Sequence, residues 1–216
     1  MENEKKIVND FHKLFYGNNL RTWDDTYWMG VRVTKNPLDL WIYQEIIFNI
    51  KPDLIIECGT KFGGSALFFA NMLDLIGKGK IISIDLYRYG ELPKHDRIDY
   101  WIGESSTSPV VTGQIESEIE WLHKENPVIL VNLDSDHSKA HVLKELEIYS
   151  KFVTVGSYLI LEDTNVHGHP VNEEHPLGPM EALEEFLKTN NDFMIDKSKE
   201  KYYLTFNPNG YLKKIK

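Results

Sequence analysis

The sequence has a single cysteine, Cys58, so no disulfide bond can form within the chain. A chain without disulfides suits a reducing compartment. No apolar stretch follows the charged start, as a signal peptide would require, and no apolar run is long enough to span a bilayer. We therefore expect a cytoplasmic protein.

Positive charge is also in short supply. The chain has 24 Lys and Arg against 33 Asp and Glu, which gives a formal net charge of −9. Nucleic acids and anionic membranes bind basic surfaces, so we expect neither as a partner. A length of 216 residues with 42% hydrophobic residues predicts one domain with a sizeable core.

The most informative stretch is residues 53–65, Asp-Leu-Ile-Ile-Glu-Cys-Gly-Thr-Lys-Phe-Gly-Gly-Ser. Its apolar run predicts a buried strand, Gly59 permits a sharp turn, and a helix is expected from Ser65. Gly63 and Gly64 leave room for backbone to approach a ligand. A strand, a glycine turn and a helix in this order are typical of the first ligand-binding corner of an open α/β sheet.

The remaining chain alternates between predicted strands and helices. The expected helices are 1–20, 39–50 (with Asp39 as cap), 65–76, 114–124, 138–150 and 179–188. The expected strands are the one with the apolar run 54–56, then 80–85, 98–102, 127–133, 153–161, 193–195 and 202–206, with 211–215 as an extension of the last. This alternation predicts a Rossmann-like α/β fold with a mostly parallel seven-stranded sheet flanked by helices. An N-terminal helix and aromatic lid segment (1–38) would precede the main domain (39–216).

Two acids near the first corner bear on the ligand. Asp85 ends the second strand of the main domain, where nucleoside binders place an acid for ribose hydroxyls, although a simple strand-end cap is an equal alternative. The glycines depart from Gly-x-Gly-x-x-Gly, and Glu57 stands beside the turn. A carboxylate there disfavours a pyrophosphate and suits a cationic ligand, so S-adenosylmethionine is favoured over NAD.

A second group of acids follows two later strands. Asp134 and Asp136 end the strand at 127–133, and Glu162 and Asp163 end the strand at 153–161. Converging carboxylates need a cation, and oxygen ligands favour Mg²⁺, Ca²⁺ or Mn²⁺ over zinc. The alternative is ordinary strand-end caps in solvent. A His-x-His loop with His167, His169 and nearby His175 is a weaker, zinc-like signal.

Several motifs together resemble the cephalosporin hydroxylase family. They are Trp28-Met-Gly30, residues 35–45 (Lys-Asn-Pro-Leu-Asp-Leu-Trp-Ile-Tyr-Gln-Glu), the Glu-Cys-Gly-Thr corner, Leu-Asp-Ser-Asp-His-Ser-Lys-Ala-His-Val at 133–142, and residues 156–164 with Glu-Asp-Thr. Despite the family's name, its members resemble S-adenosylmethionine-dependent O-methyltransferases, including rhamnosyl and macrolide-sugar methyltransferases. The resemblance implies the class I methyltransferase fold.

The resemblance also implies site residues. Magnesium would be bound by Asp136, Glu162 and Asp163. For the proton acceptor, Asp134, His137 and Lys139 all stay open. The methyl-donor pocket would be lined by Glu57, Gly59, Thr60, Gly63, Ser65, Asp85, Gly103, Glu104 and Ser105.

We therefore predict a metal-dependent O-methyltransferase that acts on a hydroxyl of a small molecule, either a glycosyl group or a secondary metabolite. We also expect a homo-oligomer. Two alternatives remain: an NAD(P)-dependent oxidoreductase on the same sheet, which the Glu57 corner disfavours, and a non-catalytic binding protein that has kept the fold.

Overall fold

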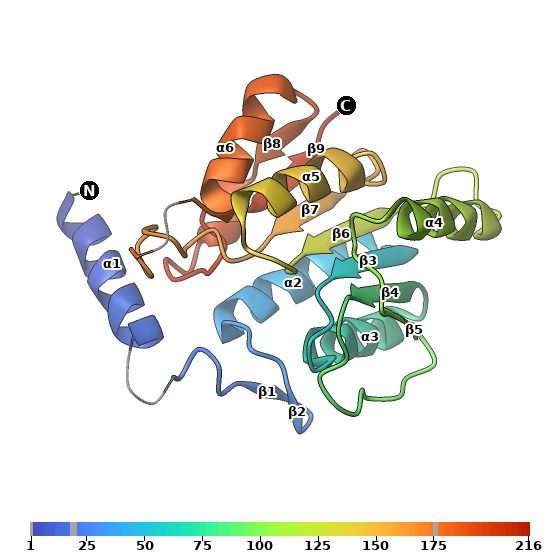
Figure 1. Cartoon of the computed structure of the whole chain (residues 1–216), viewed down its shortest axis with the longest axis horizontal. Coiled ribbons are helices and arrows are strands. Elements are labelled where there is room, and N and C mark those ends of the chain that lie inside the picture. Colours follow the sequence, from blue (N-terminus) through green and yellow to red (C-terminus); the bar gives the residue numbers. More distant parts are fainter. Residues whose placement is uncertain (1, 18–20, 175–176) are drawn as a thin grey trace.

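A twisted sheet forms the centre of the molecule (Figure 1). The computed structural model describes residues 2–17, 21–174 and 177–216. In this described part, seven strands pair in the order β5-β4-β3-β6-β7-β9-β8. The direction of β9 is opposite to that of the other six, so its pairs with β7 and β8 are antiparallel. The strands are β3 (Leu54–Cys58), β4 (Lys80–Asp85), β5 (Ile98–Ile102), β6 (Ile129–Leu133), β7 (Tyr158–Leu161), β8 (Phe193–Ile195) and β9 (Tyr211–Lys214). The predicted mostly parallel seven-stranded sheet is confirmed.

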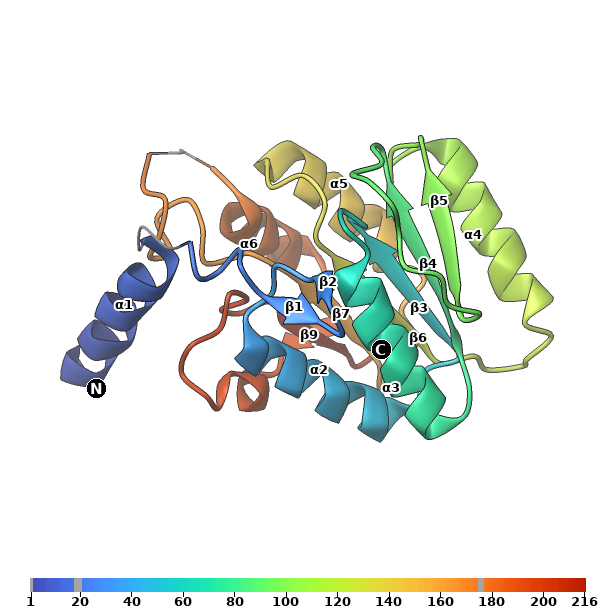
Figure 2. The same ribbon diagram turned by 90° about the horizontal axis from the view of Figure 1, so that it is seen from below.

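Helices cover both faces of the sheet (Figure 2). One face packs against α2 (Pro37–Ile50) and α3 (Gly64–Ile76). The other face packs against α4 (Pro109–Trp121), α5 (Lys139–Tyr149) and α6 (Pro179–Thr189). Among the described helices, none has both the length and the apolar character needed to cross a membrane.

The central strand β3 shows why this sheet is buried on both sides. All five of its residues are buried. Leu54, Ile56 and Cys58 pack with the α4–α6 side, whereas Ile55 packs with α2 and α3. Successive strand residues point to opposite faces, so a continuous apolar run supplies both layers at once.

The start of α2 differs from the prediction. Asn36, not Asp39, caps the helix: its side chain accepts a hydrogen bond from the backbone N–H of Leu38 at 3.1 Å, and Pro37 takes the first helical position. Asp39 is instead buried and accepts hydrogen bonds from the Thr205 and Tyr211 hydroxyls at 2.6 and 2.8 Å. It therefore fastens α2 to the C-terminal segment.

Other elements also begin at residues different from the predicted ones. The lid segment predicted as irregular contains a short antiparallel hairpin, β1 (Tyr27–Trp28) and β2 (Val31–Arg32). Helix α4 begins at Pro109 because Ser108 caps it, five residues before the predicted start. The strand predicted over 153–161 begins only at Tyr158, after a turn at residues 155–156.

The prediction of a strand over 202–206 is wrong. This segment follows the short 3-10 helix η1 (Lys197–Glu200) as turns, and β9 alone forms the last pair with β7 and β8. Its backbone is fixed by other partners: the carboxylate of buried Asp39 accepts from the Phe206 N–H at 2.8 Å.

Helix α1 (Glu2–Gly17) lies at the edge of the molecule (Figures 1 and 2). The predicted helix extended over residue 1 and residues 18–20, which lie outside the described part. Ile7, Phe11 and Leu14, on the predicted apolar face, are exposed, and His12 alone in this helix is buried. Most of α1 therefore does not pack against the sheet.

Candidate active site

The strand ends at one edge of the sheet enclose a cavity of about 620 Å³. Its wall includes Gly59, Thr60, Ser65, Asp85 and Ser105 at one end and Asp134, Asp136, His137 and Asp163 at the other. The cavity thus joins the predicted donor-binding corner to the predicted acidic group, as expected for the carboxyl ends of parallel strands. Predicted residues that do not line it are Glu57, Gly63, Gly103, Glu104, Lys139 and Glu162.

The glycine corner is closely packed against the acidic loop. Gly59 has φ +101°, and a Cβ there would lie 1.9 Å from the backbone oxygen of Asp134. Gly64 opens α3, where a Cβ would lie 2.2 Å from the backbone oxygen of Arg32. Only glycine fits at these positions, because a side chain would collide with the backbone of Asp134 or Arg32.

Glu57 lies beneath this corner. It is fully buried, and its Oε2 accepts a hydrogen bond from the Ser83 hydroxyl at 2.5 Å, whereas Oε1 has no hydrogen-bond partner among the described residues. Burial raises the pKa of Glu57 to about 7, against the opposing effect of hydrogen bonds from Ser65 and Ser83. An unpaired buried carboxylate oxygen is costly, and it marks a position where a cationic or donating ligand group would be stabilised.

Asp85 closes the donor end of the cavity. Its two carboxylate oxygens accept from the backbone N–H groups of Lys61 and Tyr87, at 2.8 and 3.0 Å. The backbone N–H of Gly103 donates to the Asp85 carbonyl at 2.9 Å, so Gly103 shapes this wall from behind. Asp85 therefore caps the loop and also lines the cavity, and its contact with a ribose stays a prediction.

At the other end, the loop after β6 meets the loop after β7. The Nε2 atom of His137 lies 3.3 Å from Asp134 Oδ1 and 3.2 Å from Asp163 Oδ2. Single ligand atoms of these three residues all lie within 4.8 Å of one another. Neighbouring strands thus bring acids together as predicted.

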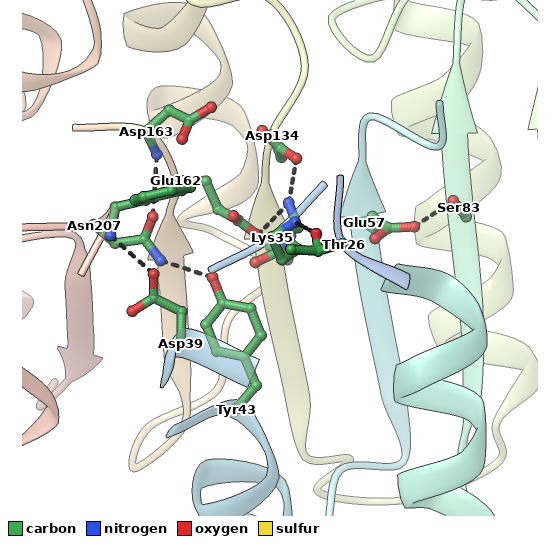
Figure 3. A network of polar contacts seen from close by, with 12 residues as sticks. Thr26, Lys35, Asp39, Tyr43, Glu57, Ser83, Asp134, Glu162, Asp163 and Asn207 are labelled. Atoms are coloured by element: carbon green, nitrogen blue, oxygen red, sulfur yellow. Dashed lines mark hydrogen bonds and ion pairs between the residues drawn. The ribbon is translucent and has the colours of Figure 1, made fainter. Parts of the chain in front are cut away.

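A buried lysine completes this cluster (Figure 3). Lys35, which follows the β1–β2 hairpin, is 3% exposed and pairs with Asp134 and, at 2.8 Å, with Glu162 Oε1. Asn132 Nδ2 donates to the same Glu162 oxygen at 2.8 Å. Glu162 therefore points to the lysine and not into the cavity. Nothing in the sequence predicts that Lys35 pairs with these acids, although Lys35 stands within the motif at 35–45.

Asp163 is positioned by its backbone. Its φ of +53° lies in the left-handed region, and its N–H donates to Asn207 Oδ1 at 3.1 Å. Asn207 is itself held by a hydrogen bond from its Nδ2 to the Tyr43 hydroxyl at 2.7 Å (Figure 3). A strained, well-fixed backbone at the edge of a cavity is typical of functional positions.

Charge balance in the cluster follows from these contacts. Burial alone would raise the pKa of Asp134, but the charges of Lys35 and His137 hold it well below its usual range. Burial would lower the pKa of His137, but its contacts with Asp134 and Asp163 raise it to about 9. Burial raises the pKa of Glu162, and Lys35 offsets this only in part. The acids of the cluster therefore stabilise the protonated forms of Lys35 and His137.

Two predicted residues have other partners here. Asp136 lines the cavity, and its Oδ1 accepts from the backbone N–H of Ser138 at 2.7 Å at the start of α5. Lys139 lies in the first turn of α5, and its Nζ pairs with Glu185 Oε2 on α6 at 2.6 Å. Of the three candidate proton acceptors, Asp134 and His137 thus lie in the cavity wall and Lys139 does not.

The His-x-His loop forms no metal cluster among the described residues. His169 Nε2 lies 2.6 Å from Glu181 Oε1 on α6, and His175 lies outside the described residues. His169 therefore fastens this loop to α6.

Several cavity residues escaped the sequence analysis. Tyr16, Trp23, Arg32, Tyr87 and His141 all line the wall. Trp23 was noted only as part of an aromatic segment that could cover a ligand. Residues from α1 and the lid reach the cavity only through tertiary packing, which no local pattern encodes.

Comparison with known proteins is consistent with this geometry. The family model for "Rhamnosyl O-methyltransferase/CmcI" matches residues 20–215. The chain is 40% identical to the rhamnosyl O-methyltransferase of Mycobacterium leprae over 211 residues, which covers 95% of this chain and 90% of the relative. It is 38% identical to the Mycobacterium tuberculosis enzyme of the same name, over 95% of this chain and 84% of that one.

Solved structures show the same fold at low sequence identity. A structure described as "cmcI-D160 Mg-SAM" has a TM-score of 0.66 and 17% identity, and covers 89% of this chain and 78% of that one. An O-methyltransferase from Bacillus cereus in complex with SAH has a TM-score of 0.54 and 15% identity, and covers 89% and 81%. These similarities confirm the class I methyltransferase fold.

Proposed function

Because the chain belongs to the rhamnosyl O-methyltransferase/CmcI family, we propose that it transfers the methyl group of S-adenosylmethionine to a hydroxyl of a rhamnosyl group. The predicted family resemblance is confirmed, and so is the prediction of an S-adenosylmethionine-dependent O-methyltransferase. The nicotinamide-dependent alternative is thereby set aside. The choice of a rhamnosyl acceptor is based on the 40% identity, across nearly the whole chain, to a rhamnosyl O-methyltransferase.

The donor end of the cavity fits the methyl donor. Gly59 and Gly64 allow the corner to pack closely at the start of α3, and Asp85 lines the cavity at the end of β4, where a ribose would be held. Glu57 adds a buried carboxylate beneath the corner, suited to the positive charges of the donor. These features support Glu57, Gly59, Thr60, Gly63, Ser65, Asp85, Gly103 and Ser105 as the proposed donor site, with Glu57, Gly63 and Gly103 acting from behind the wall.

The acidic end fits a hard divalent cation such as Mg²⁺. Magnesium prefers oxygen ligands, so we assign the ion to carboxylates, namely Asp163 with Asp136 and Glu162. Asp136 accepts a hydrogen bond from Ser138, and Glu162 pairs with Lys35. On metal binding, each carboxylate would either bind the ion with its other oxygen or release its present partner. Asp134 and His137, which form a cluster with Asp163, would lie beside the ion.

Different residues of the chain would accept the proton and position the two substrates. When bound, S-adenosylmethionine supplies an electrophilic methyl group, and the cation stabilises negative charge on an acceptor oxygen. A cation held by the neighbouring carboxylates would lower the pKa of His137, and the neutral imidazole would then accept the proton of the acceptor hydroxyl while Asp134 orients the ring. The cavity walls hold donor and acceptor in line, which supplies much of the remaining rate.

The test is a panel of acceptors with radiolabelled S-adenosylmethionine. Methyl α-L-rhamnopyranoside represents the proposed class, methyl α-D-glucopyranoside another sugar, and catechol an aromatic diol. The proposal predicts labelled product with the rhamnoside at a rate well above that with the other two. Transfer to catechol alone would overturn the sugar assignment and leave the methyltransferase assignment standing.

A further inference from the structure

Part of the cavity wall belongs to neither the proposed donor site nor the proposed metal site. Tyr16, in the last turn of α1, and Trp23, in the segment that follows, both line this part. Their rings are stacked, with centroids 4.8 Å apart and planes 3° apart. Both side chains are partly buried, so the pair forms a fixed aromatic wall.

This wall stands at the acidic end of the cavity. Burial and the negative charges of Asp163 and Asp134 raise the pKa of Tyr16. The phenol therefore lies within electrostatic reach of the two acids that contact His137. A group resting on the wall would lie next to the site assigned to the reacting hydroxyl.

Helix α1 is anchored mainly near this wall. Tyr16 packs edge-on against Phe206 at 5.5 Å, and His12 stacks on the same ring at 5.9 Å. Asn165 Nδ2, in the loop after β7, also donates a hydrogen bond to His12 Nε2 at 2.8 Å. Ile7, one turn towards the N-terminus, is 60% exposed. The packing of α1 thus fixes the part that carries Tyr16.

Arg32 supplies polar groups beside the wall. Its Nη2 pairs with Asp24 at 2.6 Å, and its guanidinium lies 5.2 Å from the centre of the Phe62 ring, which lines the donor end. The Arg21 guanidinium lies 5.4 Å from the centre of the Trp23 ring. Only Arg32 of these two arginines lines the cavity, so the wall and Arg32 together present an apolar surface and hydrogen-bond donors.

Such a combination suits a sugar. A pyranose has an apolar face of C–H groups and a rim of hydroxyls, and few other small molecules carry both. We propose that Tyr16 and Trp23 form the acceptor subsite, where the C–H face of the sugar packs on the aromatic wall and Arg32 binds its hydroxyls. This proposal rests on the proposed function and adds a role for α1, all of which lies outside the residues matched by the family model.

The test measures binding of the two ligands separately. Tyr16→Ala and Trp23→Ala should each raise the Kd or KM for methyl α-L-rhamnopyranoside by about tenfold or more, because each removes half of the wall. Tyr16→Phe keeps the ring and should bind the rhamnoside nearly as the wild type does. The Kd for S-adenosylhomocysteine, measured by calorimetry, should stay within about twofold in all three variants, which also verifies that they fold.

Two substitutions serve as matched controls. Leu14→Ala alters an exposed side chain on the same helix, and Trp121→Ala removes an exposed aromatic ring at the end of α4. Both should leave rhamnoside binding unchanged. Wild-type affinity for the rhamnoside in Tyr16→Ala and Trp23→Ala would overturn the acceptor subsite while the proposed function stands. A wild-type protein that binds S-adenosylhomocysteine but no rhamnoside would overturn the proposed function itself.

Discussion

The carboxylates of Asp134 and Asp163 approach the same ring nitrogen of His137, at 3.3 and 3.2 Å, although the two acids follow different strands. The imidazole is thereby held between two negative charges that favour its protonated form. His137 therefore carries a proton near neutral pH, and it becomes a proton acceptor only when a bound cation lowers its pKa. The same contacts explain why the pKa of His137 is raised.

The first prediction separates His137 from Lys139. His137→Ala should lower kcat by about 10²- to 10⁴-fold, the usual contribution of a general base. Lys139→Ala should lower it by less than about threefold, because the Lys139 ammonium pairs with Glu185 outside the cavity. Single-turnover methyl transfer at saturating donor measures both. The reverse order of effects would assign the proton to Lys139.

The second prediction concerns the metal ligands. Asp163→Asn should weaken Mn²⁺ binding by at least about tenfold, as followed by electron paramagnetic resonance of the free ion, because a neutral amide replaces an anionic ligand. Asp136→Asn and Glu162→Gln should have similar effects if both carboxylates turn to the ion. Glu116→Gln, an exposed acid on α4, serves as control. Unchanged Mn²⁺ affinity in Asp163→Asn would contradict the site.

The third prediction tests the glycine corner. Gly59→Ala should weaken S-adenosylhomocysteine binding by more than about tenfold and lower Tm, because the new methyl group would collide with the Asp134 carbonyl and the backbone has a positive φ. The control is Gly113→Ala within α4, where a Cβ has open space. It should leave binding unchanged and raise stability by up to about 1 kcal/mol through helix propensity. Equal behaviour of the two variants would refute the close packing of the corner.

The central architecture could be predicted because local patterns encode it. The apolar run at 54–58 is buried on both faces, and strands that alternate with helices leave few topologies. Acids that end neighbouring parallel strands must meet at one edge of the sheet. The sequence therefore predicts that Asp134 and Asp163 lie close together. These inferences depend on backbone geometry alone.

What could not be predicted depends on tertiary contacts. Lys35 enters the acidic cluster from the N-terminal segment, nearly 100 positions before Asp134, and its spacing carries no periodic signal. Asp39 looked like a helix cap because it precedes an apolar run, but Asn36 and Pro37 come first and Asp39 is buried by the C-terminal segment. The residues 202–206 have the composition of a strand, yet Asp39 binds their backbone instead.

The fourth prediction uses the anchor of α1. Burial lowers the pKa of His12 to about 4, so the unfolded chain binds a proton between pH 6.5 and 4 that the folded chain does not. The stability that neutral His12 contributes is therefore present above pH 6.5 and is lost as pH falls towards 4. The urea midpoint of wild type should fall more steeply between pH 7 and 5 than that of His12→Gln.

The matched control for this titration is His123→Gln, which changes an exposed histidine. It should follow the wild-type pH dependence. Identical slopes for wild type and His12→Gln would show that His12 is not buried in neutral form, and the anchoring of α1 to Asn165 would then be wrong.

The account is tested most directly by methyl transfer from labelled S-adenosylmethionine to methyl α-L-rhamnopyranoside, measured with Mg²⁺, after treatment with EDTA, and after Mg²⁺ is restored. We predict labelled rhamnoside with Mg²⁺, a loss of about 10²-fold or more with EDTA, and recovery on restoration, because a divalent cation stabilises the charge that develops on the acceptor oxygen. Full activity in EDTA, or no transfer to the rhamnoside by a protein that binds the donor, would contradict it.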